Sequence, residues 1–131
     1  MVYLGSSRGI EDDETKFFMR GSALASDFLV YFPAAIAFCL TYFTQRDKAI
    51  KALALLLFQP SLILIDHGHF QYNCVSLGLA LWALVFIMNG YDVLGSIAFV
   101  LSLNYKQMSL YYAPAIFFFL LGKCLYSTPN W

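Results

Sequence analysis

Residues 23–43 read ALASDFLVYFPAAIAFCLTYF, and this stretch decides the class of fold. It is an apolar window of 21 residues that only Asp27 and Pro33 interrupt. A helix needs roughly 20 apolar residues to cross the hydrocarbon core of a bilayer. The window therefore predicts a first membrane span.

Further apolar segments follow the first one, at 49–65, 74–88, 91–103 and 110–125. The last three are short, so we expect them to be tilted, kinked or partly covered by other helices. Backbone polar groups in lipid must find hydrogen bonds within their own segment, and the sequence has no strands of alternating polarity. The chain is thus predicted to be an all-α, polytopic bundle of about five membrane-embedded helices.

The composition supports a membrane protein and excludes two kinds of partner. Hydrophobic residues make up 60% of the chain, aromatic residues 18% and charged residues only 12%, which is more apolar than a usual soluble domain. The net charge is zero, so there is no basic footprint for nucleic acid and no polybasic arm for anionic lipid. Cys39, Cys74 and Cys124 lie far apart in apolar sequence, which is typical of thiols packed against lipid or other helices.

The distribution of charge predicts the domain organisation and the orientation. Residues 1–20 form a polar juxtamembrane flank, and residues 21–131 form the transmembrane helical region. The densest basic loop runs from Arg46 to Lys51, and the positive-inside rule places it in the cytosol. The flank and residues 66–73 are then on the opposite, lumenal side.

Residues 66–73 read DHGHFQYN, the most polar run between apolar segments. In a helix, one face would carry four of these residues: Asp66, His69, Phe70 and Asn73. In an extended chain, one side would carry a different set: His67, His69, Gln71 and Asn73. Gly68 indicates a bend, so we expect a mixed geometry.

Two roles are compatible with this run, because such groups are costly at membrane depth unless they line a water-filled cavity or meet partners. In a functional site, His67 or His69 would donate to ligand oxygens, Gln71 and Asn73 would fix hydroxyls, and Phe70 or Tyr72 would stack on a ring of the ligand. In a structural role, the same groups would cap helix ends and bond across the bundle, with Asp66 holding a histidine tautomer.

A metal site is a competing interpretation of the same run. His67, His69 and Asp66 offer nitrogen and oxygen ligands that zinc or manganese accept. Two histidines without a third strong ligand nearby rarely complete such a site. We therefore expect no bound metal.

Two charged residues outside the run also have alternative roles. Lys106, in the polar turn 104–107, either meets an anionic phosphate or extends its ammonium to the membrane interface. Asp27 either pairs with Arg20, faces the cavity, or lies in the headgroup layer as an acid in the first turn of its helix.

Several segments together resemble a known family. Residues 64–73 read LIDHGHFQYN, and residues 75–78 read VSLG. Shorter matches lie in order along the chain, at 7–9, 18–20, Asp27, 104–108 and 121–124. These segments resemble the endoplasmic-reticulum glucosyltransferases that use dolichyl phosphate glucose, which have a GT-C fold. Within that family, Gly68 is more similar to the branch that adds the first glucose to lipid-linked Man9GlcNAc2 than to the branch that adds the second.

The resemblance implies a multi-pass hexosyltransferase of the endoplasmic reticulum membrane that acts in N-glycan precursor synthesis. Its partners would be dolichyl phosphate glucose, the lipid-linked oligosaccharide and membrane lipid, with no cofactor and no nucleic acid, while protein partners stay open. The donor is β-linked and the product α-1,3-linked, so the anomeric centre inverts. Such a displacement needs a carboxylate base and groups that stabilise the departing phosphate.

The resemblance also assigns residues. The base of the family is an aspartate on a lumenal loop upstream of every matching segment, so we expect no catalytic residue in this chain. As an internal fragment, the chain is expected to be inactive alone. The resemblance implies that substrate is bound by Asp66, His67, His69, Gln71, Tyr72, Asn73 and Lys106.

Two other classes of membrane protein stay open. A transporter would place such polar groups in broken helices, for which Gln59-Pro60 and Ala113-Pro114 are candidates, although no inverted repeat is visible. A non-catalytic membrane subunit would not need the polar run.

Overall fold

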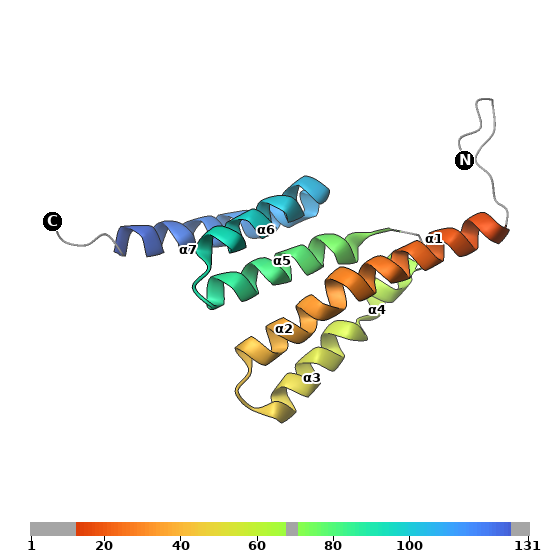
Figure 1. Ribbon diagram of the computed structural model, residues 1–131, viewed down its shortest axis with the longest axis horizontal. Helices are drawn as coiled ribbons and strands as arrows, with labels where there is room; N and C mark the ends of the chain where they lie inside the picture. Colours follow the sequence, from red (N-terminus) through yellow and green to blue (C-terminus); the bar gives the residue numbers. More distant parts are fainter. Residues whose placement is uncertain (1–12, 68–70, 127–131) are drawn as a thin grey trace.

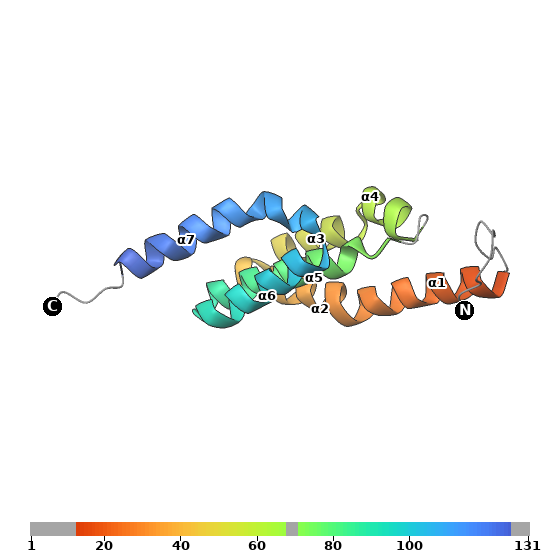
Figure 2. The same cartoon turned by 90° about the horizontal axis from the view of Figure 1, so that it is seen from above.

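The computed structural model describes residues 13–67 and 71–126, and in these ranges the chain is helical with short connections and no strand (Figures 1 and 2). The first helical rod consists of α1 (Asp13–Ser26), the π-helical turn η1 (Asp27–Tyr31) and α2 (Phe32–Tyr42). The second consists of α3 (Arg46–Leu57), α4 (Pro60–Leu62) and the π-helical turn η2 (Ile63–His67). The others are α5 (Asn73–Met88), α6 (Asp92–Tyr105), and the 3-10 turn η3 (Gln107–Tyr112) continued by α7 (Ala113–Tyr126).

Three rods are long and apolar enough to cross a membrane: Asp13–Tyr42, Arg46–Asp66 and Gln107–Tyr126. Helices α5 and α6 are shorter apolar helices. Each predicted apolar segment lies within one of these rods or helices, except that the segments 23–43 and 91–103 each extend one residue beyond theirs. The prediction of an all-α bundle of membrane helices is therefore confirmed.

The first rod begins well before the apolar window that predicted it. Asp13 and Glu14 occupy its first turn, where negative charge is favourable beside the helix dipole. Pro33 has no N–H to complete the regular helical bond to the carbonyl of Leu29, and η1 lies directly before the proline. The helix therefore runs through the predicted boundary at residue 20 and changes its winding at Asp27–Tyr31.

The second rod is interrupted at Gln59-Pro60, one of the two candidate breaks considered for a transporter, whereas the helix Gln107–Tyr126 continues through the other, Ala113-Pro114. Gln59 has an extended conformation with ψ of 115°, and Pro60 begins α4. The residue before a proline disfavours helical geometry because it would clash with the proline ring. The rod consequently bends before it reaches Asp66.

Helix α5 is the central element, in contact with α2, η1 and α6. A Cβ atom added at Gly78 would lie 3.0 Å from the Cα atom of Tyr31 and 3.1 Å from its backbone nitrogen. Small residues let the backbones of membrane helices approach closely, which gains van der Waals contact. Gly78 therefore fixes the distance between α5 and η1.

A buried cluster of serines joins α5, α6 and η3. The Oγ atom of Ser109 lies 2.8 Å from that of Ser76 and 2.6 Å from that of Ser102, and all three side chains are buried. Ser102 also donates its hydroxyl proton to the carbonyl of Ser76 at 2.7 Å. Each hydroxyl can both donate and accept, so the cluster satisfies its own members inside the bundle. It holds the α6–η3 connection against α5.

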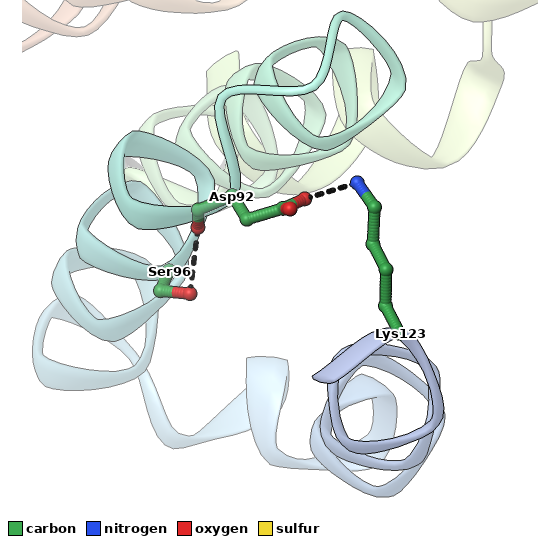
Figure 3. Close-up of polar contacts among 3 residues, drawn as sticks. All are labelled: Asp92, Ser96 and Lys123. Carbon is green, nitrogen blue, oxygen red and sulfur yellow. Dashed lines mark hydrogen bonds and ion pairs between the residues drawn. The ribbon is translucent and has the colours of Figure 1, made fainter. Parts of the chain in front are cut away.

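An ion pair joins the beginning of α6 to the end of α7. The Nζ atom of Lys123 lies 2.7 Å from a carboxylate oxygen of Asp92, and Ser96 donates to the backbone carbonyl of Asp92 (Figure 3). The side chains of Lys123 and Asp92 are 41% and 37% exposed, respectively. Such an exposed pair contributes on the order of 0–1 kcal/mol in water, so it orients α7 more than it stabilises the fold.

Candidate functional site

The candidate site lies at one end of the bundle. The end of η2, the beginning of α5 and the connection between α6 and η3 meet there, while the 43–45 loop and the 89–91 turn lie toward the other end (Figure 1). Residues that are more than 30 positions apart are thus brought together, since Lys106 bonds to both Gln71 and Asn73. Among the described residues, Asp66, Gln71 and Asn73 of the polar run form one cluster with Lys106 of the polar turn.

Asp66 is the most deeply buried residue of this cluster. Its side chain is 1% exposed, and each carboxylate oxygen accepts a hydrogen bond. Asn73 donates from Nδ2 at 2.7 Å, and Cys74 donates from its backbone nitrogen at 2.7 Å. The first backbone N–H groups of a helix have no intrahelical acceptor, and the helix dipole favours an anion beside them. Asp66 therefore stabilises the N-terminus of α5, where the N-cap residue Tyr72 provides no side-chain cap.

Asn73 connects the buried acid to the surface. Its Nδ2 group donates to Asp66 and, at 3.2 Å, to the Oε1 atom of Gln71. Its Oδ1 atom accepts a short hydrogen bond from the Nζ atom of Lys106. Lys106 also donates to Gln71 Oε1 at 3.4 Å. Of the predicted substrate-binding residues, these four form a connected network.

Burial decreases outward through this network. Asp66 and Asn73 are buried, Lys106 is half-buried and Gln71 is exposed. An ammonium carries three donors, and two are directed to amide oxygens. Within residues 13–67 and 71–126, no carboxylate lies within ion-pair distance of Lys106. The positive charge at the mouth of the cluster is therefore held by neutral groups.

The structure separates the remaining predicted residues from this network. The hydroxyl of Tyr72 lies 2.8 Å from the Oγ atom of Ser22, so this phenol contacts α1 instead of the amides. His67 is the last residue of η2, and only its backbone is described. His69, with Gly68 and Phe70, lies outside the described residues. The helical turn that ends at His67 and the non-helical Gln71 and Tyr72 agree with the mixed geometry expected from the sequence.

Asp27 lies beside the base of the cluster. Its carboxylate, that of Asp66 and the thiol of Cys74 are all buried, with one oxygen or sulfur atom of each within 4.8 Å of the others. The alternative that Asp27 lies in the first turn of its helix is wrong, because the first rod begins at Asp13 and runs unbroken past Asp27. The place of Cys74 in the site could not be predicted from the sequence, because Cys74 donates to Asp66 from its backbone nitrogen and no side-chain pattern reveals such a bond.

These three groups are the donors most suited to a metal ion among the described residues. They differ from the set considered in the sequence, which used His67 and His69. Each oxygen of Asp66 already accepts one hydrogen bond, from Asn73 or from Cys74, so an ion would share this carboxylate with two donors. The established role of Asp66 among these three groups is therefore to accept hydrogen bonds.

An apolar pocket of about 310 Å³ begins one helical turn deeper than the polar cluster. Leu77, four residues after Asn73, and Tyr112, six residues after Lys106, are on its wall. The other lining residues come from η1, the second rod, α5 and α7: Tyr31, Leu56, Gln59, Ala80, Leu81, Leu84, Ala115 and Ile116. A cationic and amide-rich mouth above an apolar pocket is complementary to an amphiphile with an anionic head.

Comparison with known proteins gives relatives at about half identity. The chain is 52% identical over 125 residues to the dolichyl pyrophosphate Man9GlcNAc2 alpha-1,3-glucosyltransferase of Rattus norvegicus, which covers 94% of this chain and 24% of the relative. It is 52% identical over 120 residues to the probable enzyme of the same name from Dictyostelium discoideum, with 90% and 23% covered. For the Saccharomyces cerevisiae enzyme of that name, the identity is 45% over 128 residues, with 93% and 24% covered.

The chain spans about a quarter of the length of these curated relatives. The profile described as the ALG6, ALG8 glycosyltransferase family matches residues 1–131, which includes the polar run and Lys106. This match assigns the chain to a family of glycosyltransferases and not to a family of transporters. The chain belongs to the ALG6, ALG8 glycosyltransferase family.

Proposed function

We propose that this chain forms the donor-binding wall of an inverting glucosyltransferase. The enzyme would move glucose from dolichyl phosphate to the lipid-linked oligosaccharide Man9GlcNAc2-PP-dolichol in N-glycan precursor synthesis. The relatives are named as alpha-1,3-glucosyltransferases that act on this oligosaccharide, which supports the branch that adds the first glucose. The activity proposed is that of the whole protein, of which this chain supplies one part.

The observation that carries this proposal is the environment of Lys106. Its ammonium is held by the amide oxygens of Asn73 and Gln71, and not by a carboxylate of the described residues. A cation with one donor left over attracts an anion, and charge-assisted hydrogen bonds to phosphate are among the strongest in proteins. We infer that Lys106 binds the phosphate of the lipid-linked sugar.

The apolar pocket supports the same ligand. Its wall includes Leu77, one helical turn after Asn73, and Tyr112, six residues after Lys106. A dolichyl phosphate has an anionic head joined to a branched hydrocarbon chain. The polar cluster would hold the head while the pocket holds the first part of the chain, which orients the sugar away from the membrane interior.

The chemistry expected of this chain is stabilisation of the leaving group. The 3-hydroxyl oxygen of the acceptor mannose attacks C1 of glucose, the bond between C1 and the phosphate oxygen breaks, and the phosphate takes the electron pair. The hydroxyl proton would pass to a carboxylate base, which the resemblance to the family places on a lumenal loop upstream of the matching segments. Lys106 would donate to the phosphate oxygens as negative charge develops there, and Gln71 would bind hydroxyls beside them.

The proposed setting is the endoplasmic reticulum membrane, with the cluster on the lumenal side and residues 1–20 as a lumenal flank. The basic residues Arg46, Lys48 and Lys51 lie on α3, toward the end of the bundle away from the cluster (Figure 1). The positive-inside rule then orients the molecule.

This orientation is testable by cysteine labelling in a chimera in which residues 1–131 replace the matching segment of the Saccharomyces cerevisiae relative. Cys39 and Cys74 are buried and Cys124 is exposed, so Cys124→Ser gives the background. In intact microsomes, a membrane-impermeant maleimide should modify Lys48→Cys and should reach Gln71→Cys only after permeabilisation, as read by mass spectrometry at each position. Modification of Gln71→Cys in sealed vesicles would place the cluster in the cytosol and refute the proposal.

A second prediction concerns His69. In the same chimera, His69→Ala should reduce glucose transfer to lipid-linked Man9GlcNAc2 about tenfold to a hundredfold, since a lost hydrogen bond to a charged group costs about 1.5–3 kcal/mol. Membrane abundance should stay nearly unchanged. Full transfer by this variant would remove His69 from the site. A parent chimera that restores no transfer to cells lacking the yeast enzyme would count against the proposed function itself.

A further inference from the structure

The orientation of the Asn73 amide is fixed from both sides. A carboxylate has no proton to donate, so Asp66 can only face the Nδ2 end of this amide. An ammonium has no lone pair to offer, so Lys106 can only face the Oδ1 end. The chain Asp66–Asn73–Lys106 therefore has a single arrangement of donors and acceptors.

Asp66 is held too firmly to change this arrangement. It is almost fully buried, and its second oxygen accepts from the backbone nitrogen of Cys74 at the beginning of α5. The acid is thus anchored to the helix that carries Asn73. Its oxygens accept from donors that belong to α5, and it forms no direct ion pair with the ammonium of Lys106.

The neutral amide of Asn73 consequently separates the carboxylate of Asp66 from the ammonium of Lys106. If a carboxylate occupied position 73, it would pair with Lys106 and offset the charge that attracts an anion. An amide oxygen holds the ammonium in place without offsetting that charge. The same side chain also keeps Gln71 in contact with the cluster.

We propose that Asp66 is a positioning residue which, through the Asn73 amide, holds Lys106 with its charge uncompensated for a phosphate-bearing lipid. This inference rests on the proposed function, and it adds the device by which the site stays cationic. Asp66 does not touch the substrate in this arrangement.

The test uses the chimera and measures the KM for dolichyl phosphate glucose, kcat and membrane abundance. Asn73→Asp should raise the donor KM about tenfold or more, because a carboxylate beside the ammonium repels a phosphate. It should also reduce abundance, since two acids would then face each other. Combining it with Asp66→Asn should restore abundance: the new amide at position 66 accepts from Cys74 and donates to the new acid at position 73.

The donor KM of the double variant should nevertheless stay raised, because the acid beside Lys106 remains. A purely structural role for Asp66 and Asn73 predicts instead that KM recovers together with abundance, and that result would overturn the inference. Asn89→Asp is the matched control: this amide lies at the other end of α5 and donates to the Val85 carbonyl at 2.7 Å. It should leave KM unchanged. A parent chimera without transfer activity would overturn the proposed function and this inference together.

Discussion

With Lys106 replaced by Met, the KM for the lipid-linked donor is expected to rise about tenfold to a hundredfold. Hydrogen bonds to charged groups contribute about 1.5–3 kcal/mol, and one such bond to the phosphate would be lost. Met keeps the apolar stem of lysine and removes the charge and the donors, so packing against the bundle is preserved. Steady-state kinetics of the chimera at varied donor concentration give the measurement.

Lys123→Met is the control for this effect. Lys123 is also a partly exposed lysine with an identified partner, Asp92 (Figure 3). It lies in the last turn of α7, which ends far from the beginning of α5 (Figure 1). The control should leave the donor KM unchanged and lower stability by less than about 1 kcal/mol. Equal kinetics for both variants at limiting donor would mean that Lys106 only anchors the chain at the membrane interface.

Replacing Gly78 by Leu is expected to prevent accumulation of the folded protein. Even a Cβ atom at this position would lie 3.0 Å from the Cα atom of Tyr31, and backbone cannot move aside as a side chain can. Overpacking of a tight contact costs about 1–3 kcal/mol or more, a large part of the about 5–15 kcal/mol that stabilises a typical domain. Membrane abundance and the thermal midpoint in detergent would both fall.

The same change at Gly122 provides the comparison. A Cβ atom there meets nothing within 4 Å among the described residues, and Leu is a better helix former than Gly. Gly122→Leu should therefore leave abundance at or above that of the parent. A normal level of the Gly78→Leu variant would show that α5 and η1 can separate without loss of the fold.

The helices of this fold were predictable because hydropathy over about 20 residues reports whether a segment can lie in lipid. Of the two candidate breaks, Gln59-Pro60 interrupts its helix, since proline restricts the residue before it, and Ala113-Pro114 does not. The starting point of the first rod was not predictable, because Asp13 and Glu14 belong to a polar segment that hydropathy alone assigns to solvent. This segment is helical because its acids are favourable beside the helix dipole and because it continues directly into the apolar helix. A hydropathy average over a window reports neither effect.

The contacts between helices could not be derived from one sequence. Ser76, Ser102 and Ser109 are unremarkable as separate residues, and only the fold brings their hydroxyls together. Gly78 likewise has no signal of its own, since its importance comes from a backbone 47 positions earlier, at Tyr31. Pairing between distant segments is information that periodicity does not carry.

The candidate site was predictable in its membership more than in its connections. Polarity in apolar sequence and the resemblance to the family together make Asp66, Gln71, Asn73 and Lys106 candidates. The structure joins them. Which residue donates and which accepts in each of these hydrogen bonds could not be predicted from the sequence. Tyr72 instead meets Ser22 on α1, a residue that no local pattern connects to it.

The shortness of α5 and α6 has a consequence for the surrounding lipid. They contain 16 and 14 residues, which at 1.5 Å per residue gives lengths of roughly 24 and 21 Å. The hydrocarbon layer is about 30 Å thick, so this hairpin creates a hydrophobic mismatch that local thinning of the bilayer relieves at a cost of fractions of a kcal/mol per Å. Headgroups beside the hairpin would then sink toward Lys106, and a lipid-borne sugar would meet the protein below the mean level of the membrane surface.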